Sequence, residues 1–300
     1  MSGEAAPPRE GWAYPLRRRN ERRLPPDWEG PAYIWDIDNT YLLTEWDGLR
    51  DLIRIRLEAA EDKRPVPGAV ELLAGLRRVE VGGQRPPVWF VSASPETMRP
   101  VLERRMLLDG VVHDGITFRS LRSLRHLRDI FGYKLAALLL YRLESPLGAR
   151  EVLFGDDREH DPWIYELYAR ACAGTCRGAE LEAALAPRGV RTQARRYIAA
   201  LAGELAARDA VEWIFIRRTG AAKVEADPPD DPRLVFLDDF AQAAALLRAL
   251  GRIPAEDLRC VLAAARAAGL GAEPLRAVQE KAARLPAGAP ARVAAELEGT

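Results

Sequence analysis

Two carboxylates follow a short apolar run near the N-terminal end of the chain. The run 32–35 has no charge and leads directly into Asp36, Ile37 and Asp38. Such a run predicts a buried strand, and open α/β sheets bind ligands at the carboxyl ends of their strands. Two like charges this close need a cation or a shared proton. We therefore expect a divalent metal and a phosphorylated substrate, with Asp36 as nucleophile and Asp38 as its acid/base partner.

Other groups of the kind needed for phosphoryl transfer follow at the ends of predicted elements. They are, in chain order, Ser92, Lys134, Asp156 and Asp161. A serine hydroxyl and nearby backbone N–H groups can hold phosphoryl oxygens, and a lysine supplies positive charge where negative charge develops. Carboxylates bind Mg²⁺. An attacking carboxylate divides the displacement into two steps through an aspartyl-phosphate, and a second carboxylic acid protonates the leaving oxygen and later activates water.

The sequence also predicts the elements that would position these groups. Apolar strands at 32–35, 88–91 and 152–154 alternate with segments of helical apolar spacing, and further strands are expected at 211–216 and 234–237. This alternation predicts an α/β fold with a mainly parallel sheet. Ser94 is expected to cap the helix after the second strand, with Pro95 as its first residue. Helices are expected at 52–57, 69–76, 95–106, 135–141 and 164–172. From Phe240 onward we expect helices only.

A second apolar strand that ends in paired acids competes for the metal. The run 234–237 leads into Asp238 and Asp239. We prefer Asp156 and Asp161, because they carry a Gly-Asp turn and closely follow the lysine. The two later acids would then cap the helix that begins at Phe240. Whether Asp157 or Asp161 is the second acid of the metal motif stays open.

Composition limits the class of protein. The chain has 300 residues, 48% of them apolar, and its 44 basic and 44 acidic side chains cancel. These values are typical of globular proteins and give no reason to expect nucleic acid as a partner. No apolar run approaches the ~18–20 residues of a transmembrane helix, and the N-terminus lacks a signal-peptide pattern, so we expect a cytoplasmic protein. The sequence does not indicate an oligomeric state.

The chain divides into three parts by composition. Residues 1–29 form a Pro/Arg-rich arm, which the prolines predict to be irregular and whose arginines are expected to face solvent. Residues 30–240 are expected to form the α/β domain, and residues 241–300 a helical C-terminal extension. The roles of the arm and of the extension stay open.

The motifs together resemble the haloacid dehalogenase-like (HAD) phosphatase superfamily. The segments that carry the resemblance are Asp-Ile-Asp-Asn-Thr (36–40), Val-Ser-Ala-Ser-Pro (91–95), Tyr-Lys (133–134) and Gly-Asp-Asp-Arg-Glu-His-Asp-Pro (155–162). The resemblance implies a Rossmann-like three-layer fold, Mg²⁺ dependence and the roles given above. It also implies that the backbone carbonyl of Asp38 binds the metal beside Asp36 and Asp156, and that Asn39, Ser92 and Ala93 contact the phosphate.

A finer similarity concerns the substrate. Residues 91–95 and 155–165 are similar to the actin-patch-type phosphatidate phosphatases, although Asn39 replaces an acidic residue and Asp157-Arg158 replace Ser-Gly. This similarity implies hydrolysis of phosphatidic acid by a protein that lies peripherally at a membrane. The 55 residues between Asp36 and Ser92, and the 21 between Lys134 and Asp156, leave room for only a minimal cap, and an open site suits a bulky substrate. The alternatives are a HAD phosphatase for protein, nucleic-acid ends or small phosphates, and a catalytically silent scaffold.

Overall fold

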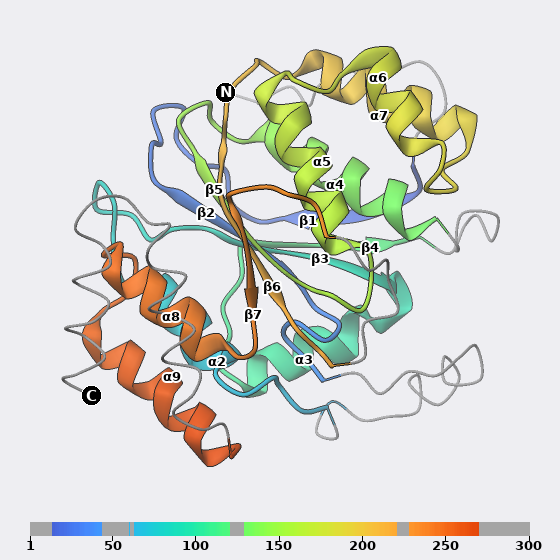
Figure 1. Cartoon of the computed structure of the whole chain (residues 1–300). Helices are drawn as coiled ribbons and strands as arrows, with labels where there is room; N and C mark the ends of the chain where they lie inside the picture. Colours follow the sequence, from blue (N-terminus) through green and yellow to red (C-terminus); the bar gives the residue numbers. More distant parts are fainter. Residues whose placement is uncertain (1–13, 44–59, 61–62, 121–128, 221–227, 270–300) are drawn as a thin grey trace.

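A computed structural model describes residues 14–43, 60, 63–120, 129–220 and 228–269 (Figure 1). Its centre is a seven-stranded sheet in the order β1-β4-β3-β2-β5-β6-β7. Only β1 runs antiparallel to its neighbour, and the other pairs are parallel. The strands are β1 Leu16–Asn20, β2 Pro31–Asp36, β3 Val88–Pro95, β4 Gly115–Arg119, β5 Arg150–Asp156, β6 Val211–Arg217 and β7 Leu234–Leu237. The expected α/β fold with a mainly parallel sheet is confirmed.

Helices cover both faces of this sheet (Figure 1). Four of them lie on one face, namely α4 Ile130–Glu144, α5 Asp161–Ala173, α6 Gly178–Leu185 and α7 Thr192–Glu204. The opposite face is covered by α2 Ala69–Leu76, α3 Arg99–Leu108, α8 Phe240–Ala249 and α9 Ala255–Ala267. The helices α8 and α9 pack against α2 and share its hydrophobic core. This part of the predicted C-terminal extension therefore belongs to a layer of the α/β fold, and residues 270–300 lie outside the described residues.

Strand β2 stands where the strand order reverses. On one side lie β3 and β4, and on the other lie β5, β6 and β7. All six residues of β2 are buried, because both faces of the strand are covered by helices. Trp35 stacks on Phe154 of β5 with ring centroids 4.0 Å apart, and burial of a phenylalanine of this kind contributes about 1.5–3 kcal/mol. Ligands of open α/β sheets bind beyond the carboxyl ends of the strands at such a reversal, which is where β2 delivers Asp36.

Two strands were missed by the sequence reading. Residues 16–20 of the arm, predicted to be irregular, form β1, and residues 115–119, where the sequence predicted no strand, form β4. The two strands pair with each other at the edge of the sheet. Arginines of β1 form ion pairs with acidic side chains of later elements, including Arg17 with Glu96 and Arg18 with Glu144. These ion pairs hold the arginine-rich segment against the sheet, whereas its sequence pattern had predicted that its arginines face solvent.

The start of α3 also differs from the prediction. The strand β3 continues through Ser94 to Pro95, and a 3₁₀ turn at Glu96–Met98 precedes the helix. Ser94 therefore caps no helix, and the expected first helical residue ends a strand. The expected helix at 52–57 lies outside the described residues. None of the helices that the structure describes is long and apolar enough to cross a membrane.

Candidate active site

The loop after β2 turns back on itself immediately beyond Asp36. The backbone N–H groups of Tyr41 and Leu42 both donate to the carbonyl oxygen of Ile37 at 2.9 Å, and Asn39 N donates to Leu42 O at 2.7 Å. Asn39 has φ 58°, a left-handed conformation that asparagine tolerates better than most residues. The turn keeps Asp38 beside the end of the strand, so both carboxylates of the first motif stay at the carboxyl edge of the sheet.

A buried lysine stands at the centre of the site. Lys134, in the second turn of α4, has its Nζ 2.6 Å from Asp161 Oδ1, 2.9 Å from Asp36 Oδ1 and 3.0 Å from Glu159 Oε2. The side chains of Lys134, Asp36 and Asp161 are at most 1% exposed, whereas that of Glu159 is 26% exposed. The predicted residues from β2, α4 and the segment after β5 thus meet in one cluster.

The protonation of this cluster follows from burial and the lysine. Burial raises the pKa of Asp36 and of Asp156 well above the usual range, and the nearby Asp161 carboxylate adds to the rise, although Lys134 opposes it. For Lys134 burial alone would lower the pKa, but Asp161, Asp36 and Glu159 outweigh it and raise the pKa well above its usual value. The lysine therefore stays cationic, but its single positive charge does not balance the carboxylates around it.

Three carboxylates converge closely enough to hold a cation. Asp36, Asp156 and Asp161 each offer an oxygen, and these oxygens lie within 4.8 Å of one another. Asp36 Oδ2 and Asp156 Oδ2 are buried and have no hydrogen-bond partner among the described residues. Both oxygens of Asp161 already accept hydrogen bonds, one from Lys134 Nζ and one from Asp156 N at 3.3 Å. Two orphaned carboxylate oxygens in a buried acidic cluster fit a hard divalent cation such as Mg²⁺.

The Gly-Asp turn of the last motif has a steric reason. A Cβ on Gly155 would lie 2.5 Å from Asp161 Oδ2, so only glycine lets Asp161 approach the end of β5. The alternative acid, Asp157, turns away from the cluster and accepts hydrogen bonds from Thr219 N and Oγ1 at 2.8 and 2.7 Å. Of the two acids that the sequence left open, Asp161 is the one that joins the carboxylate cluster.

The rival pair after β7 lies apart from the cluster. Asp239 is the N-cap of α8 and accepts from the backbone of Ala241 and Gln242, as expected. Asp238 does not cap the helix; its side chain pairs with Arg218 and accepts from Gln242 Nε2. Neither residue joins the group of convergent carboxylates among the described residues.

Two serines of β3 hold the side chain of Asp38. Its Oδ2 accepts from Ser94 Oγ at 3.0 Å and from Ser92 Oγ at 3.3 Å. Ala93, between them in β3, is buried. The contact of Ser94 was missed, although alternate residues of a strand share a face, so its spacing from Ser92 could have indicated it.

Two arginines near the site were also missed. Arg119 ends β4, and its positive charge acts on Asp38 and Glu159. Arg217 ends β6, where it pairs in register with Asp156 and donates from Nη1 to Asn39 O at 2.9 Å. Burial lowers the pKa of both guanidinium groups, but their nearby carboxylates oppose the shift. Only the strand order brings these residues to the site, and the sequence reading had no β4.

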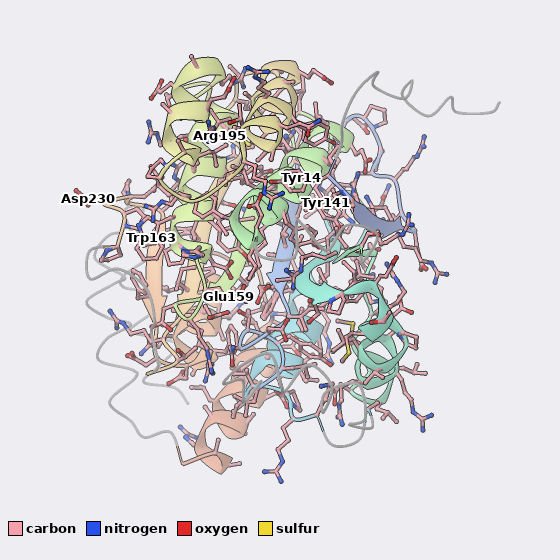
Figure 2. All side chains as sticks on the ribbon, turned by 90° about the vertical axis from the view of Figure 1, so that its right-hand side faces the viewer. Tyr14, Tyr141, Glu159, Trp163, Arg195 and Asp230 are labelled. Atoms are coloured by element: carbon pink, nitrogen blue, oxygen red, sulfur yellow. The ribbon has the colours of Figure 1, made fainter. Side chains whose placement is uncertain are left out.

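The helix α4 carries the lysine, and the first turn of this helix is fixed by the N-terminal segment. Asp129 caps the helix by accepting from Gly132 N at 2.9 Å, and it also accepts a hydrogen bond from the hydroxyl of Tyr14. Figure 2 labels Tyr14 beside the green helix α4. A Cβ on Gly132 would collide with the Tyr14 hydroxyl, so the glycine is needed for this close approach.

A comparison with protein families finds a match over the segment that holds this cluster. Residues 32–178 match the family described as phosphatidate phosphatase APP1, catalytic domain. The matched segment is just under half of the chain and includes every residue of the predicted catalytic and metal sets. No curated protein and no solved structure matches the chain. The family match supports a phosphatase with phosphatidate phosphatase-like activity.

Proposed function

We propose that the chain is a Mg²⁺-dependent phosphomonoester hydrolase of the HAD type that acts on phosphatidic acid. The observation that carries the proposal is the coincidence of the family match with the buried cluster of Asp36, Lys134, Asp156 and Asp161. The strand order supports the HAD assignment. Counted from β2, the parallel strands follow the order 3-2-1-4-5-6, which is that of Rossmann-like doubly wound sheets.

Asp36 is the nucleophile in this proposal. Its Oδ1 is held by the lysine, and its attack on phosphorus forms an aspartyl-phosphate while the bond to the leaving oxygen breaks. Asp38, oriented by Ser92 and Ser94, gives a proton to the leaving oxygen and then takes one from the water that hydrolyses the intermediate. Lys134 remains protonated throughout and stabilises the negative charge that develops on the phosphoryl oxygens.

The orphaned oxygens of Asp36 and Asp156 would hold Mg²⁺, together with the backbone carbonyl of Asp38. When bound, the ion neutralises the nucleophile and the phosphoryl oxygens and so lets two anions approach. Asp161 supports the site differently, because its oxygens accept from Lys134 and from the backbone of Asp156. Ser92, Ala93 and Asn39 are proposed to contact the phosphate.

The lipid assignment rests on the described family. Only 21 residues separate Lys134 from Asp156, and α4 and β5 occupy most of them, so no lid can be inserted there. Residues 44–59, within the other gap, lie outside the described residues. An open site is compatible with a phosphate monoester presented at a membrane surface, with the protein bound peripherally.

Phosphate release tests this function. The full-length protein is assayed with phosphatidic acid in mixed vesicles, and separately with a soluble aryl phosphate, each with MgCl₂ or with EDTA. We expect hydrolysis that needs Mg²⁺, is faster on the lipid, and falls by at least about 10³-fold in Asp36→Asn. Equal rates in wild type and Asp36→Asn would refute the mechanism. Hydrolysis of the aryl phosphate alone would leave a phosphatase with another substrate, and no hydrolysis of either would favour a partner-binding scaffold.

A further inference from the structure

Carboxylate oxygens of this chain crowd the ammonium group of Lys134, and that of Asp161 accepts a hydrogen bond from it. An ammonium group has three N–H donors, and three carboxylate oxygens, from Asp161, Asp36 and Glu159, lie 2.6, 2.9 and 3.0 Å from Nζ. A phosphoryl oxygen that contacts Lys134 must therefore take the place of one of them. The proposed catalysis needs that contact, so one carboxylate has to leave when substrate binds.

Glu159 is the carboxylate best placed to leave. Asp36 ends a strand and Asp161 begins a helix, and both side chains are essentially unexposed. Glu159 lies on the connection between β5 and α5, and its side chain is 26% exposed. Figure 2 labels Glu159 in the central part of the molecule, below the green and yellow helices. Although its contacting oxygen, Oε2, is buried, Glu159 has the most exposed side chain of the three acids around Lys134.

The charge of a second cation also acts on Glu159. The positive charges that act on its carboxylate include those of Lys134 and Arg119, and Arg119 acts in turn on Asp38. A phosphoryl group bound between the nucleophile Asp36 and the acid Asp38 would need these same two cations. The carboxylate of Glu159 carries one negative charge on two acceptor oxygens. It can therefore take the place of two oxygens of a phosphoryl group at this position.

We propose that Glu159 is an internal competitor, whose carboxylate occupies the phosphoryl position on Lys134 and is displaced by the phosphate of the substrate. The inference rests on the proposed function, because it takes the substrate to be a phosphomonoester. Its consequence is a lowered affinity for anions. The apparent affinity for a ligand is reduced to the fraction of molecules whose site is free. A site closed by Glu159 nine times in ten therefore binds phosphate about tenfold more weakly.

The affinity for inorganic phosphate tests the inference without catalysis. Titration calorimetry of the full-length protein, with MgCl₂ present, compares wild type with Glu159→Gln, which keeps the shape and removes the charge. Glu166→Gln is the matched control, because Glu166 lies on α5 and is paired with Arg170 rather than with the lysine. We expect phosphate to bind about tenfold more tightly to Glu159→Gln than to wild type, and the control to bind like wild type. Unchanged or weaker binding to Glu159→Gln, or no binding to either protein, overturns the proposal.

Two further variants strengthen the test. Glu159→Asp keeps the charge but is shorter by one methylene, so we expect a partial gain in phosphate affinity, whereas a merely structural role predicts none. Arg119→Gln should weaken phosphate binding even when combined with Glu159→Gln; an undiminished affinity would remove Arg119 from the site. Thermal melts establish that each variant is folded. If wild type hydrolyses no phosphomonoester but the affinity gain is observed, the proposed function fails while the competition by Glu159 stands.

Discussion

Lys134 Nζ lies 2.6 Å from Asp161 Oδ1, and neither side chain is exposed by more than 1%. A buried charge is costly unless it is paired, and here one lysine serves several carboxylates. The fold therefore depends on this cation, yet the same crowding leaves Asp36 and Asp156 with oxygens that have no hydrogen-bond partner among the described residues. Stability and the proposed binding of a metal are therefore opposed at this site.

Replacing the lysine should destabilise the protein strongly. Lys134→Met leaves buried carboxylates without their cation, and we expect the free energy of unfolding in urea to fall by about 3–5 kcal/mol. Adding Asp161→Asn should recover part of the loss, since it removes one uncompensated charge, but it should not restore phosphate release. A Lys134→Met protein as stable as wild type would contradict the account of the cluster.

Neutralising Asp156 should separate metal binding from stability. In EDTA, Asp156→Asn removes one of several crowded carboxylates, and we expect a melting temperature about 3 °C higher, as a gain near 1 kcal/mol gives in a domain of this size. MgCl₂ should raise the melting temperature of wild type but not of this variant. Asp157→Asn is the neighbouring control: its Oδ1 can still accept from Thr219, and the variant should keep the Mg²⁺ response. An equal Mg²⁺ response in Asp156→Asn would remove Asp156 from the metal site.

The hydroxyl of Tyr14 and the missing side chain of Gly132 should be energetically coupled. Gly132→Ala places a methyl group against the Tyr14 hydroxyl, so we expect it to destabilise the protein despite the better helix propensity of alanine. In a Tyr14→Phe background the clash is relieved and the same change should cost less, by about 1 kcal/mol. Urea unfolding of the four proteins gives the coupling energy. Additive effects would show that Tyr14 does not contact the first turn of α4.

A pH-dependent contribution is expected from Asp231. Burial raises its pKa, but hydrogen bonds from Arg233 outweigh burial and hold the pKa below its usual range. A carboxylate whose pKa is depressed by folding stabilises the protein above its unfolded value of about 3.9 and loses this contribution as the pH falls through the folded value. Asp231→Asn should therefore cost about 1 kcal/mol at pH 7 and progressively less below about pH 4. A difference in unfolding free energy that grows toward acid would reverse the sign of this argument.

The parts of the molecule that were predictable are those in which pattern and burial coincide. The run 32–35 is apolar because β2 is covered on both faces, and Asp239 caps α8 as its position before the helix indicated. Strand β4 was missed although Ile116 and Phe118 alternate with polar residues, because the segment is only five residues long and the pairing with β1 and β3 that makes it a strand is not visible in the local sequence. Arg119 was missed with it, since nothing local marks it as part of the site.

The contacts that distinguish similar residues were not predictable from local sequence. Asp157 and Asp161 are both acidic and close to Gly155, and only the space left by that glycine brings Asp161 to the end of β5. Ser94 resembles a helix cap because Pro95 follows it. However, β3 continues to Pro95, and the hydroxyl of Ser94 donates to Asp38 instead. Tertiary contacts outweighed local preference in both cases.

The most direct test of the central claim is the identity of the phosphorylated residue. Full-length wild type with MgCl₂ is mixed with phosphatidic acid vesicles, quenched in acid within the first turnover, digested and analysed by mass spectrometry. The account predicts a phosphoryl group on Asp36, formed and lost at rates compatible with turnover, and none in Asp36→Asn. Turnover with the phosphoryl group on another residue, or continued turnover in Asp36→Asn, would contradict it.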